Sequence, residues 1–215
     1  MEMYYPNGEK MNCLEEFVDY YSKMYFYWAD KDQEDRIVDL LSKGLKRVQG
    51  KPNIEDVKAI MEWKTGRKAN NKNLISTRRK DQYINLQEIV DYFPQEMEIT
   101  PEKFSEKIAD NDDVNNVGPV YGITLLFFAS KGKYPIYDRF AELAIRALLS
   151  EKEAKPKECG WYAKTLPNKF ETAYERYIEN LKLVVQGTDV ACTGCTQESR
   201  KLDRALWVYG HMFQK

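Results

Sequence analysis

The sequence predicts an all-α fold. Apolar residues recur at three- and four-residue steps through most of the chain, as they do on the buried face of amphipathic helices. Convincing alternation of apolar and polar residues, the pattern of half-buried strands, is absent. A chain of 215 residues is long enough for one sizeable core. We therefore expect a single unit of about nine or ten helices.

Three helices are expected in the first third of the chain. Their apolar periods cover about residues 12–29, residues 37–45 with an end near Gly50, and residues 54–61. Asn53 is the predicted N-cap of the third helix, since asparagine is among the best residues at that position. Gly66 is expected to end it, because glycine adopts the left-handed conformation that often follows a helix.

A strongly basic interval follows the third predicted helix. Residues 64–80 contain seven Lys and Arg residues, no Asp or Glu, and no hydrophobic period, so the interval is predicted to be a loop. It is either an ordinary solvated loop or a contact to phosphates. The residues assigned to phosphate contact are Arg67, Lys68, Arg78 and Arg79.

Two more helices are expected before the middle of the chain. Residues 84–90 resume a helical rhythm that stops before Pro94. Thr100 and Pro101 form a helix start, with the threonine as cap and the proline in the first turn, and this helix is expected to stop near Asp110.

The second half of the chain also reads as helical. After a polar turn at residues 111–116, the apolar run that follows Gly118 is expected to be a buried helix, with a strand as the alternative. Three further apolar periods then indicate helices at about residues 140–148, 170–181 and 202–213.

Charge and cysteine content limit the classes of function. The 33 basic and 34 acidic residues give a net charge of −1, without the basic surplus that is usual for nucleic-acid binders. The unbroken apolar runs are far shorter than the ~20 residues of a membrane-spanning helix, so no membrane partner is expected. The uneven cysteine spacing, without a leader of the signal-peptide type, indicates a reducing, cytoplasmic setting.

The most informative segment, residues 114–148, reads VNNVGPVYGITLLFFASKGKYPIYDRFAELAIRAL. It contains a hairpin ending in Val117-Gly118, a buried helix, a turn at Gly132, and a hydrophobic pair before Asp138, which follows Gly118 by 20 positions. In residue types and spacing the segment resembles the helix-hairpin-helix DNA glycosylases, and the run from Gly132 to Asp138 is similar to that of members which remove adenine from mismatches. The resemblance implies two closely packed lobes. About residues 1–50 and 140–215 would form a helical lobe, and about residues 53–139 the lobe that carries the hairpin.

The hairpin is predicted to grip the DNA backbone. Backbone N–H groups at a helix N-terminus attract a phosphate oxygen without any side-chain charge, and glycine lets the phosphate come close. The hairpin residues are Asn116, Val117, Gly118, Val120 and Gly122. The resemblance also implies a monovalent cation that bridges hairpin carbonyls to phosphate, and no other metal or cofactor.

The chain departs from the family pattern at two hairpin positions. Asn116 replaces the first glycine of the hairpin, which is tolerable because asparagine enters left-handed conformations more readily than most residues. Val120 replaces the lysine that bifunctional members use as a Schiff-base nucleophile, and a valine has no amine to attack the sugar. We therefore expect no strand-cleaving lyase activity.

Asp138 takes the position of the family's catalytic aspartate. The resemblance implies that its carboxylate stabilises an oxocarbenium-like sugar and orients or deprotonates the water that displaces the base. Alternatively, Asp138 is an ordinary N-cap for the helix that begins at Arg139, and the two roles are compatible.

Weaker signals suggest a base pocket. Trp63 and Lys64 occupy roughly the place of a family segment that fills the gap left by the flipped base, and Tyr137 precedes Asp138. Asp203 and Trp207 lie four apart on the last helix, similar to a pair that grips the base in 8-oxoguanine glycosylases. The alternatives are a packed Trp63, an ion pair from Asp203 to Arg200 or Arg204, and a Trp207 in the core.

The remaining candidates for metal or redox chemistry are read as structural. Cys192 and Cys195 form a CxxC pair that lacks two further nearby cysteines, so no iron–sulfur cluster or zinc site is expected. His211 is the single histidine and lies beside the core stripe of the last helix.

The sequence thus predicts a monomeric, monofunctional DNA N-glycosylase of base-excision repair. The alternative is a non-catalytic DNA-binding or structural protein that retains the fold, which the neutral charge and Asn116 favour.

Overall fold

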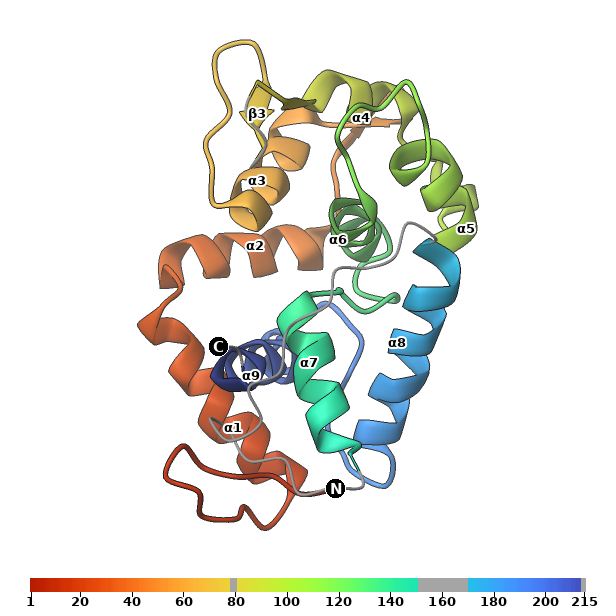
Figure 1. The fold of residues 1–215 in the computed structure, drawn as a ribbon. Helices are drawn as coiled ribbons and strands as arrows, with labels where there is room; N and C mark the ends of the chain where they lie inside the picture. The colour runs from red at the N-terminus through yellow and green to blue at the C-terminus, as the bar shows by residue number, and fades with distance from the viewer. Residues whose placement is uncertain (78–80, 151–169, 214–215) are drawn as a thin grey trace. The chain divides into compact units, whose positions relative to one another are not determined.

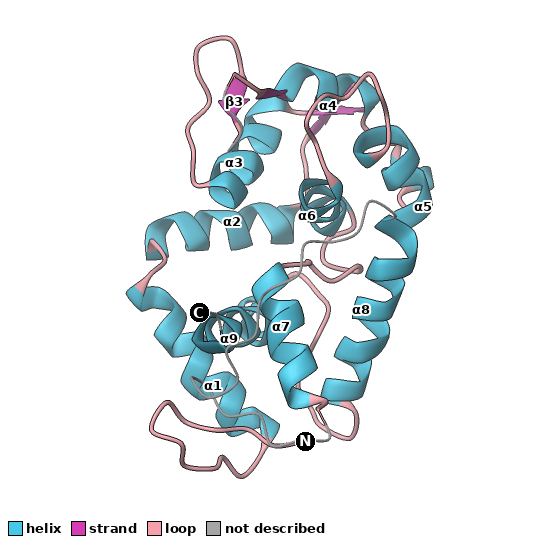
Figure 2. Cartoon of the chain, viewed as in Figure 1, coloured by secondary structure: helices cyan, strands magenta, loops and turns pink. Residues whose placement is uncertain are grey.

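Helices dominate the computed structural model, which describes residues 1–77, 81–150 and 170–213 (Figure 1). Within these ranges there are nine α-helices and two two-stranded antiparallel sheets (Figure 2). The all-α class is therefore confirmed, and the two small sheets are elements that the sequence analysis did not predict. No helix in the same ranges is long and apolar enough to cross a membrane.

The described residues divide into two units. Unit 1 consists of residues 1–31, 137–150 and 172–213, and unit 2 of residues 32–136 with 170–171. The sequence placed the two boundaries near residues 50 and 139, whereas the structure places them after Lys31 and Ile136. Residues 32–50 belong to unit 2 because they lead into the first small sheet, whose second strand packs against a helix of that unit.

Unit 1 is organised around its last helix. Its elements are α1 Leu14–Met24, the 3-10 turn η1 Tyr25–Tyr27, α7 Arg139–Leu148, α8 Phe170–Val185 and α9 Gln197–Phe213. Helix α9 packs against both α1 and α7 (Figure 1). Tyr209 lies at the α1–α9 contact, where the rings of Phe17 and Tyr21 each come within 5.0 Å of its ring centroid. Edge-to-face and tilted arrangements of this kind are the favoured ones for aromatic pairs.

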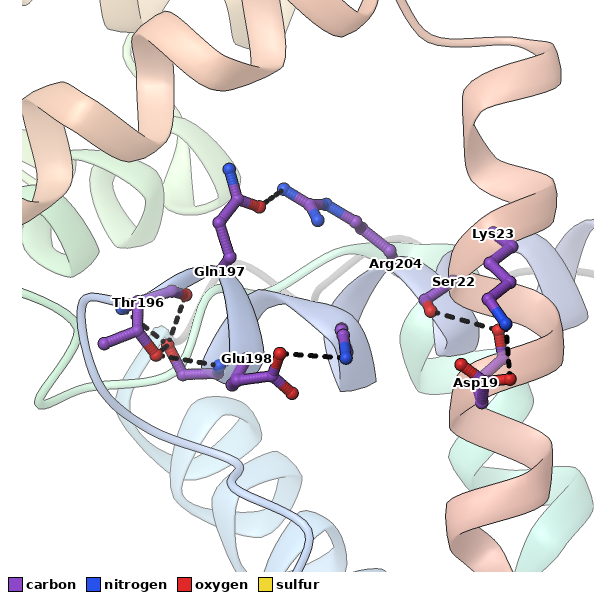
Figure 3. A network of polar contacts seen from close by, with 9 residues as sticks. Asp19, Ser22, Lys23, Thr196, Gln197, Glu198 and Arg204 are labelled. Atoms are coloured by element: carbon purple, nitrogen blue, oxygen red, sulfur yellow. Dashed lines mark hydrogen bonds and ion pairs between the residues drawn. The ribbon is translucent and has the colours of Figure 1, made fainter.

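Helix α9 has a reciprocal cap at its start. The Ser199 N–H donates to Thr196 Oγ1 at 3.2 Å, and the Thr196 N–H donates to Ser199 Oγ at 3.1 Å (Figure 3). Two backbone donors that a helix start leaves without partners are thereby satisfied.

Unit 2 is built on a buried apolar helix. Its helical elements are α2 Lys31–Lys43, α3 Ile54–Thr65, α4 Leu86–Tyr92, η2 Glu96–Glu98, α5 Pro101–Phe104, the π-helical turn η3 Ser105–Ala109 and α6 Pro119–Ala129. Helix α6 packs against α3, α5 and η3. All residues from Gly122 to Phe128 are buried, as expected of a helix that is apolar all round. A helix here confirms the first interpretation of this run over the strand.

The predicted helix caps of unit 2 are confirmed. The Asn53 side chain accepts a hydrogen bond from the Glu55 N–H, and Thr100 accepts one from the Lys103 N–H. Gly66 ends α3 in the left-handed conformation, with φ of 66°. These caps depend only on neighbouring residues, which is why the sequence was sufficient to predict them.

The two small sheets were not predicted. Strand β1 Arg47–Val48 pairs with β2 Lys51–Pro52, and β3 Leu74–Ser76 pairs with β4 Tyr83–Asn85. Ile84, which we placed in a helix, lies in β4 opposite Ile75 of β3, and both side chains are buried. The helix begins only at Leu86, after the Asn85 cap. Pairing between distant residues decided this segment, and strands of two or three residues are too short to show an alternating pattern.

Candidate functional site

The hairpin before α6 has the backbone conformation that its sequence predicts. Asn116 is left-handed, with φ of 62°, and Val117 beside it is buried. Gly118 is extended and stands at the N-cap of α6, where no side chain caps the helix and Pro119 occupies the first turn. Nothing lies within 4 Å of a Cβ built on Gly118. The start of α6 therefore has open space beside an uncapped helix N-terminus.

Asn116 is also tied to the β3–β4 sheet. Its Nδ2 donates to the Tyr83 carbonyl at 2.8 Å, which holds the hairpin against β4. Farther along α6, the Val120 carbonyl accepts a hydrogen bond from Thr124 Oγ1 at 2.9 Å. Asn116 thus has two structural roles: its backbone adopts the left-handed conformation of the turn, and its side chain ties the hairpin to β4.

We expect Asn116→Ala to lower the free energy of unfolding by about 1–2 kcal/mol, the cost of a left-handed residue with an ordinary Cβ. Asn116→Gly should cost less, because glycine adopts this conformation freely and only the Tyr83 hydrogen bond is lost. Urea unfolding of both variants measures the difference. Equal losses would show that the conformation at this position costs alanine nothing.

Asp138 stands at the start of α7. Its backbone is extended, and Oδ1 accepts a hydrogen bond from the Phe140 N–H at 2.9 Å, so Asp138 is the N-cap of α7 as predicted. The residue is half-buried. A carboxylate at this position lies at the positive end of the helix dipole, an arrangement that stabilises the start of α7.

Buried tyrosines accompany Asp138 in unit 1. The Tyr137 and Tyr177 rings meet edge to face with centroids 5.0 Å apart. Burial, followed by the negative charges of Asp203 and Asp138 among its neighbours, raises the pKa of Tyr177 well above its ordinary value. Tyr177 is thus a neutral phenol under the electrostatic influence of both carboxylates.

The alternative interpretation is confirmed for Asp203 and only partly for Trp207. Asp203 forms an ion pair with the buried Arg200, one turn earlier on α9. Trp207 is half-buried rather than part of the core. Its ring contacts those of Tyr25 at 5.4 Å and Phe140 at 6.3 Å between centroids.

His211 completes the aromatic group around Trp207. Its ring stacks on Phe140 and lies 3.9 Å from the Trp207 ring centroid. Nδ1 lies 2.8 Å from the Trp207 carbonyl oxygen, which only accepts, so Nδ1 carries the proton. Burial lowers the pKa of His211, and a neutral imidazole with this tautomer has its lone pair on Nε2.

Trp63 is packed within unit 2. Its Nε1 donates to Glu34 at 3.2 Å, and its ring meets Phe128 edge to face at 5.9 Å. Both Trp63 and Lys64 lie in the last turn of α3 and are half-buried. These contacts fit the interpretation of Trp63 as a packed tryptophan at a helix end.

Two basic residues of the interval 64–80 stabilise the loop in which they lie. The Arg67 guanidinium donates to the Ser76 carbonyl at 3.1 Å and to the Thr77 carbonyl, which anchors β3. Lys68 pairs with Glu62 at 2.9 Å. Arg78 and Arg79 lie outside the described residues.

Glu62 organises the start of this loop. Burial raises the pKa of the Glu62 carboxyl, but a hydrogen bond from the Ala69 N–H and the Lys68 ammonium outweigh burial, so the pKa lies below its ordinary value. The N–H bond is 2.9 Å long. Glu62 therefore stays charged and holds the loop to α3.

Cys192 and Cys195 are free thiols of intermediate exposure, and burial raises the pKa of the Cys192 thiol. Among the residues that the structure describes, no group of three or more His, Cys, Asp or Glu side chains is arranged to hold a metal ion.

The predicted site residues fall into two sets. Tyr137, Asp138, Asp203 and Trp207 belong to unit 1, and the hairpin with Trp63, Lys64, Arg67 and Lys68 belongs to unit 2. Sequence reasoning missed Tyr177, and it treated His211 only as structural. A usable signal for His211 was its position four residues after Trp207, which places both on one face of α9.

Comparisons of this chain with protein-family models, with curated proteins and with solved structures find no match.

Proposed function

We propose that this chain is a monofunctional DNA N-glycosylase with a helix-hairpin-helix fold. One observation carries the proposal: the left-handed Asn116 and the extended Gly118 precede an uncapped helix start, 20 positions before an aspartate that opens the next helix. The spacing and the aspartate are similar to those of the family, and the left-handed conformation of Asn116 supports a hairpin at the position where the family has glycine. A hairpin for the DNA backbone and a carboxylate for the sugar are the two parts that base excision requires.

The hairpin would bind a phosphate of the DNA backbone. The start of α6 offers the positive end of the dipole and the Val120 N–H to an anion, since Pro119 has no N–H and the Tyr121 N–H donates to the Gly118 carbonyl. The open space at Gly118 allows a close approach. Such a contact needs no basic side chain, so a net charge of −1 is compatible with DNA binding.

The hairpin also fits the monovalent cation of the family in its donor chemistry. Asn115 and Asn116 are exposed and supply backbone carbonyl oxygens, which are the ligands that hard cations prefer. When bound, the cation would add positive charge for the phosphate. The chain's own contribution is to hold the backbone of these residues, which Asn116 does through Tyr83.

Asp138 would act at the sugar of an extruded nucleotide. The bond from C1′ to the base nitrogen breaks, the base leaves with the bonding electrons and takes up a proton, and the oxygen of water bonds to C1′. The carboxylate stabilises the positive charge that develops on the sugar and accepts a proton from the attacking water. Capping of α7 by Oδ1 holds the carboxylate in one orientation.

The absence of an amine at Val120 limits the reaction to base release. A Schiff base on C1′ requires a neutral amine as nucleophile, and the valine side chain has none. The product would be an intact strand with an abasic site.

The test is base release, followed by mass spectrometry, from oligonucleotides that carry oxidised, alkylated and deaminated bases. Release of a free base without strand cleavage is the expected result and would identify the substrate. Binding of these oligonucleotides without release from any of them would overturn the enzymatic proposal.

Gly118→Ala tests the hairpin separately from the chemistry. We expect unchanged stability, since a Cβ there meets nothing and the backbone conformation suits alanine. The affinity for duplex DNA should fall about 10- to 100-fold, the loss of one hydrogen bond to a charged group. Fluorescence anisotropy measures the affinity, and Val48→Ala, at an exposed position of the same unit, is the control. Unchanged affinity in Gly118→Ala would exclude close approach of the DNA at this residue.

A second candidate is a DNA-binding protein without catalysis. Its supporting observation is that Asp138 has a structural role as cap and that Asp203 is paired with Arg200. This candidate predicts DNA binding through the hairpin and no base release in any variant.

A further inference from the structure

Four consecutive aromatic residues follow the first helix of unit 1. Tyr25, Phe26 and Tyr27 form the turn η1, and Trp28 follows it. The turn packs against α9, where the Trp207 ring lies 5.4 Å from Tyr25 and 6.5 Å from Trp28 between centroids. Trp207 also contacts Phe140 and His211. These rings form one continuous group, which we call the Trp207 cluster: Tyr25, Trp28, Phe140, Trp207 and His211.

The cluster has an exposed end. Trp28 is 61% exposed, and the neighbouring Tyr27 is 83% exposed, whereas Tyr25 and Phe26 are half-buried. A turn that only closed the hydrophobic core would bury its largest rings, since these gain the most from leaving water. Here Trp28, whose ring contacts Trp207, extends the packed aromatic group toward solvent.

Cations lie over the same group. The guanidinium of the buried Arg204 lies 5.1 Å from the Phe26 ring and 5.9 Å from the Tyr25 ring, and it donates a hydrogen bond to Gln197 Oε1 at 2.8 Å (Figure 3). The Arg139 guanidinium lies 4.7 Å from the Phe140 ring. Rings interleaved with arginine are typical of surfaces that bind single-stranded nucleic acid.

We infer that Trp28, at the exposed end of the Trp207 cluster, forms a stacking platform for a nucleobase held outside the duplex, with the exposed Tyr27 beside it in the chain. The inference rests on the proposed function and specifies its substrate class as nucleotides in unpaired or extruded form. Stacking requires only the π-face that every base has, so an exposed ring can hold a base without a charged partner. Asp30 and Asp32 adjoin the turn, so the platform is not uniformly basic.

A second copy of this chain fits the platform less well. An aromatic side chain buries about 150–250 Å² on contact. Two such rings supply much less than the roughly 1,200–2,000 Å² that a specific protein interface buries. A single base, in contrast, needs only one or two ring faces.

The experiment compares two single-stranded probes: twelve thymidines, and a backbone of the same length that has abasic residues in place of every base. Wild type, Trp28→Ala and Trp28→Phe are titrated against both, with Leu183→Ala on α8 as an exposed apolar control in the same unit. Fluorescence anisotropy gives the affinity, and urea unfolding checks that each variant is folded.

We expect Trp28→Ala to weaken binding of the thymidine probe by about 5- to 150-fold, which corresponds to one lost base stack. Its affinity for the abasic backbone should not change. Trp28→Phe should recover most of the affinity because it keeps a ring, and Leu183→Ala should match wild type.

Three outcomes would overturn the platform: equal weakening for both probes, no weakening for either, or wild type that does not prefer thymidines to the abasic backbone. Failure of the proposed function is seen separately. If a damaged base is released while Trp28→Ala binds both probes like wild type, the glycosylase stands and the platform does not. If Trp28→Ala weakens binding of the thymidine probe alone and no base is ever released, the platform is supported and the glycosylase is not. The protein then binds DNA without cleaving the N-glycosidic bond.

Discussion

Asp138→Asn is expected to reduce the rate of base release by about 100- to 10,000-fold, the usual contribution of a positioned acid–base group. Asparagine keeps the shape of the side chain but carries no charge for the developing oxocarbenium ion and accepts no proton from water. It remains one of the best residues for an N-cap, so the hydrogen bond to the Phe140 N–H is retained. Stability and DNA affinity should therefore stay near those of wild type.

The control for this variant is Asp91→Asn, which removes the same charge from an exposed carboxylate paired with Lys51 in unit 2. Single-turnover kinetics on the released base, with anisotropy for DNA binding, separate chemistry from affinity. Release by Asp138→Asn at the wild-type rate would reduce Asp138 to a helix cap. A loss of DNA affinity equal to the loss of rate would point to a role in binding.

Gly210→Ala is expected to have the largest effect on stability. Glycine inside a helix normally costs about 1 kcal/mol relative to alanine, so helix propensity alone predicts that the alanine variant is more stable. The structure reverses the sign, because a Cβ on Gly210 would overlap the backbone carbonyl of Phe140 in the first turn of α7. We expect the free energy of unfolding to fall by about 1–3 kcal/mol, the range for overpacking in a close-packed core.

The same substitution should also disturb the site. Phe140 is the residue whose N–H the Asp138 carboxylate caps, so moving the first turn of α7 moves that carboxylate. Urea unfolding measures the stability, and Gly118→Ala, where a Cβ has open space, is the matched control. A Gly210→Ala protein that is more stable than wild type would contradict the close approach of α9 to α7.

Much of the helical framework follows from the sequence alone. The caps at Asn53, Thr100 and Asp138, the left-handed end of α3 at Gly66 and the left-handed conformation of Asn116 all agree with the structure. Each depends on a side chain and a backbone group only a few residues apart, or on the intrinsic conformation of one residue.

Contacts between distant residues account for what the sequence did not predict. The pairing of Ile75 with Ile84 and the use of Arg67 to anchor β3 depend on a sheet that has no alternating pattern. The two-unit division, with residues 32–50 in unit 2, likewise depends on which surfaces pack together.

In the candidate site, too, local features followed from the sequence and contacts between elements did not. The cap position of Asp138 and the tendency of Asn116 toward the left-handed conformation follow from the sequence because both are local, whereas the hydrogen bond that ties Asn116 to the Tyr83 carbonyl joins residues far apart in the chain. Only the tertiary structure decided that Asp203 pairs with Arg200, that His211 stacks on Phe140, and that position 210 requires glycine. In the last two cases the partner lies on another helix. For Asp203 the sequence allowed Arg200 or Arg204 as the partner, and only the packing of the side chains decided between them.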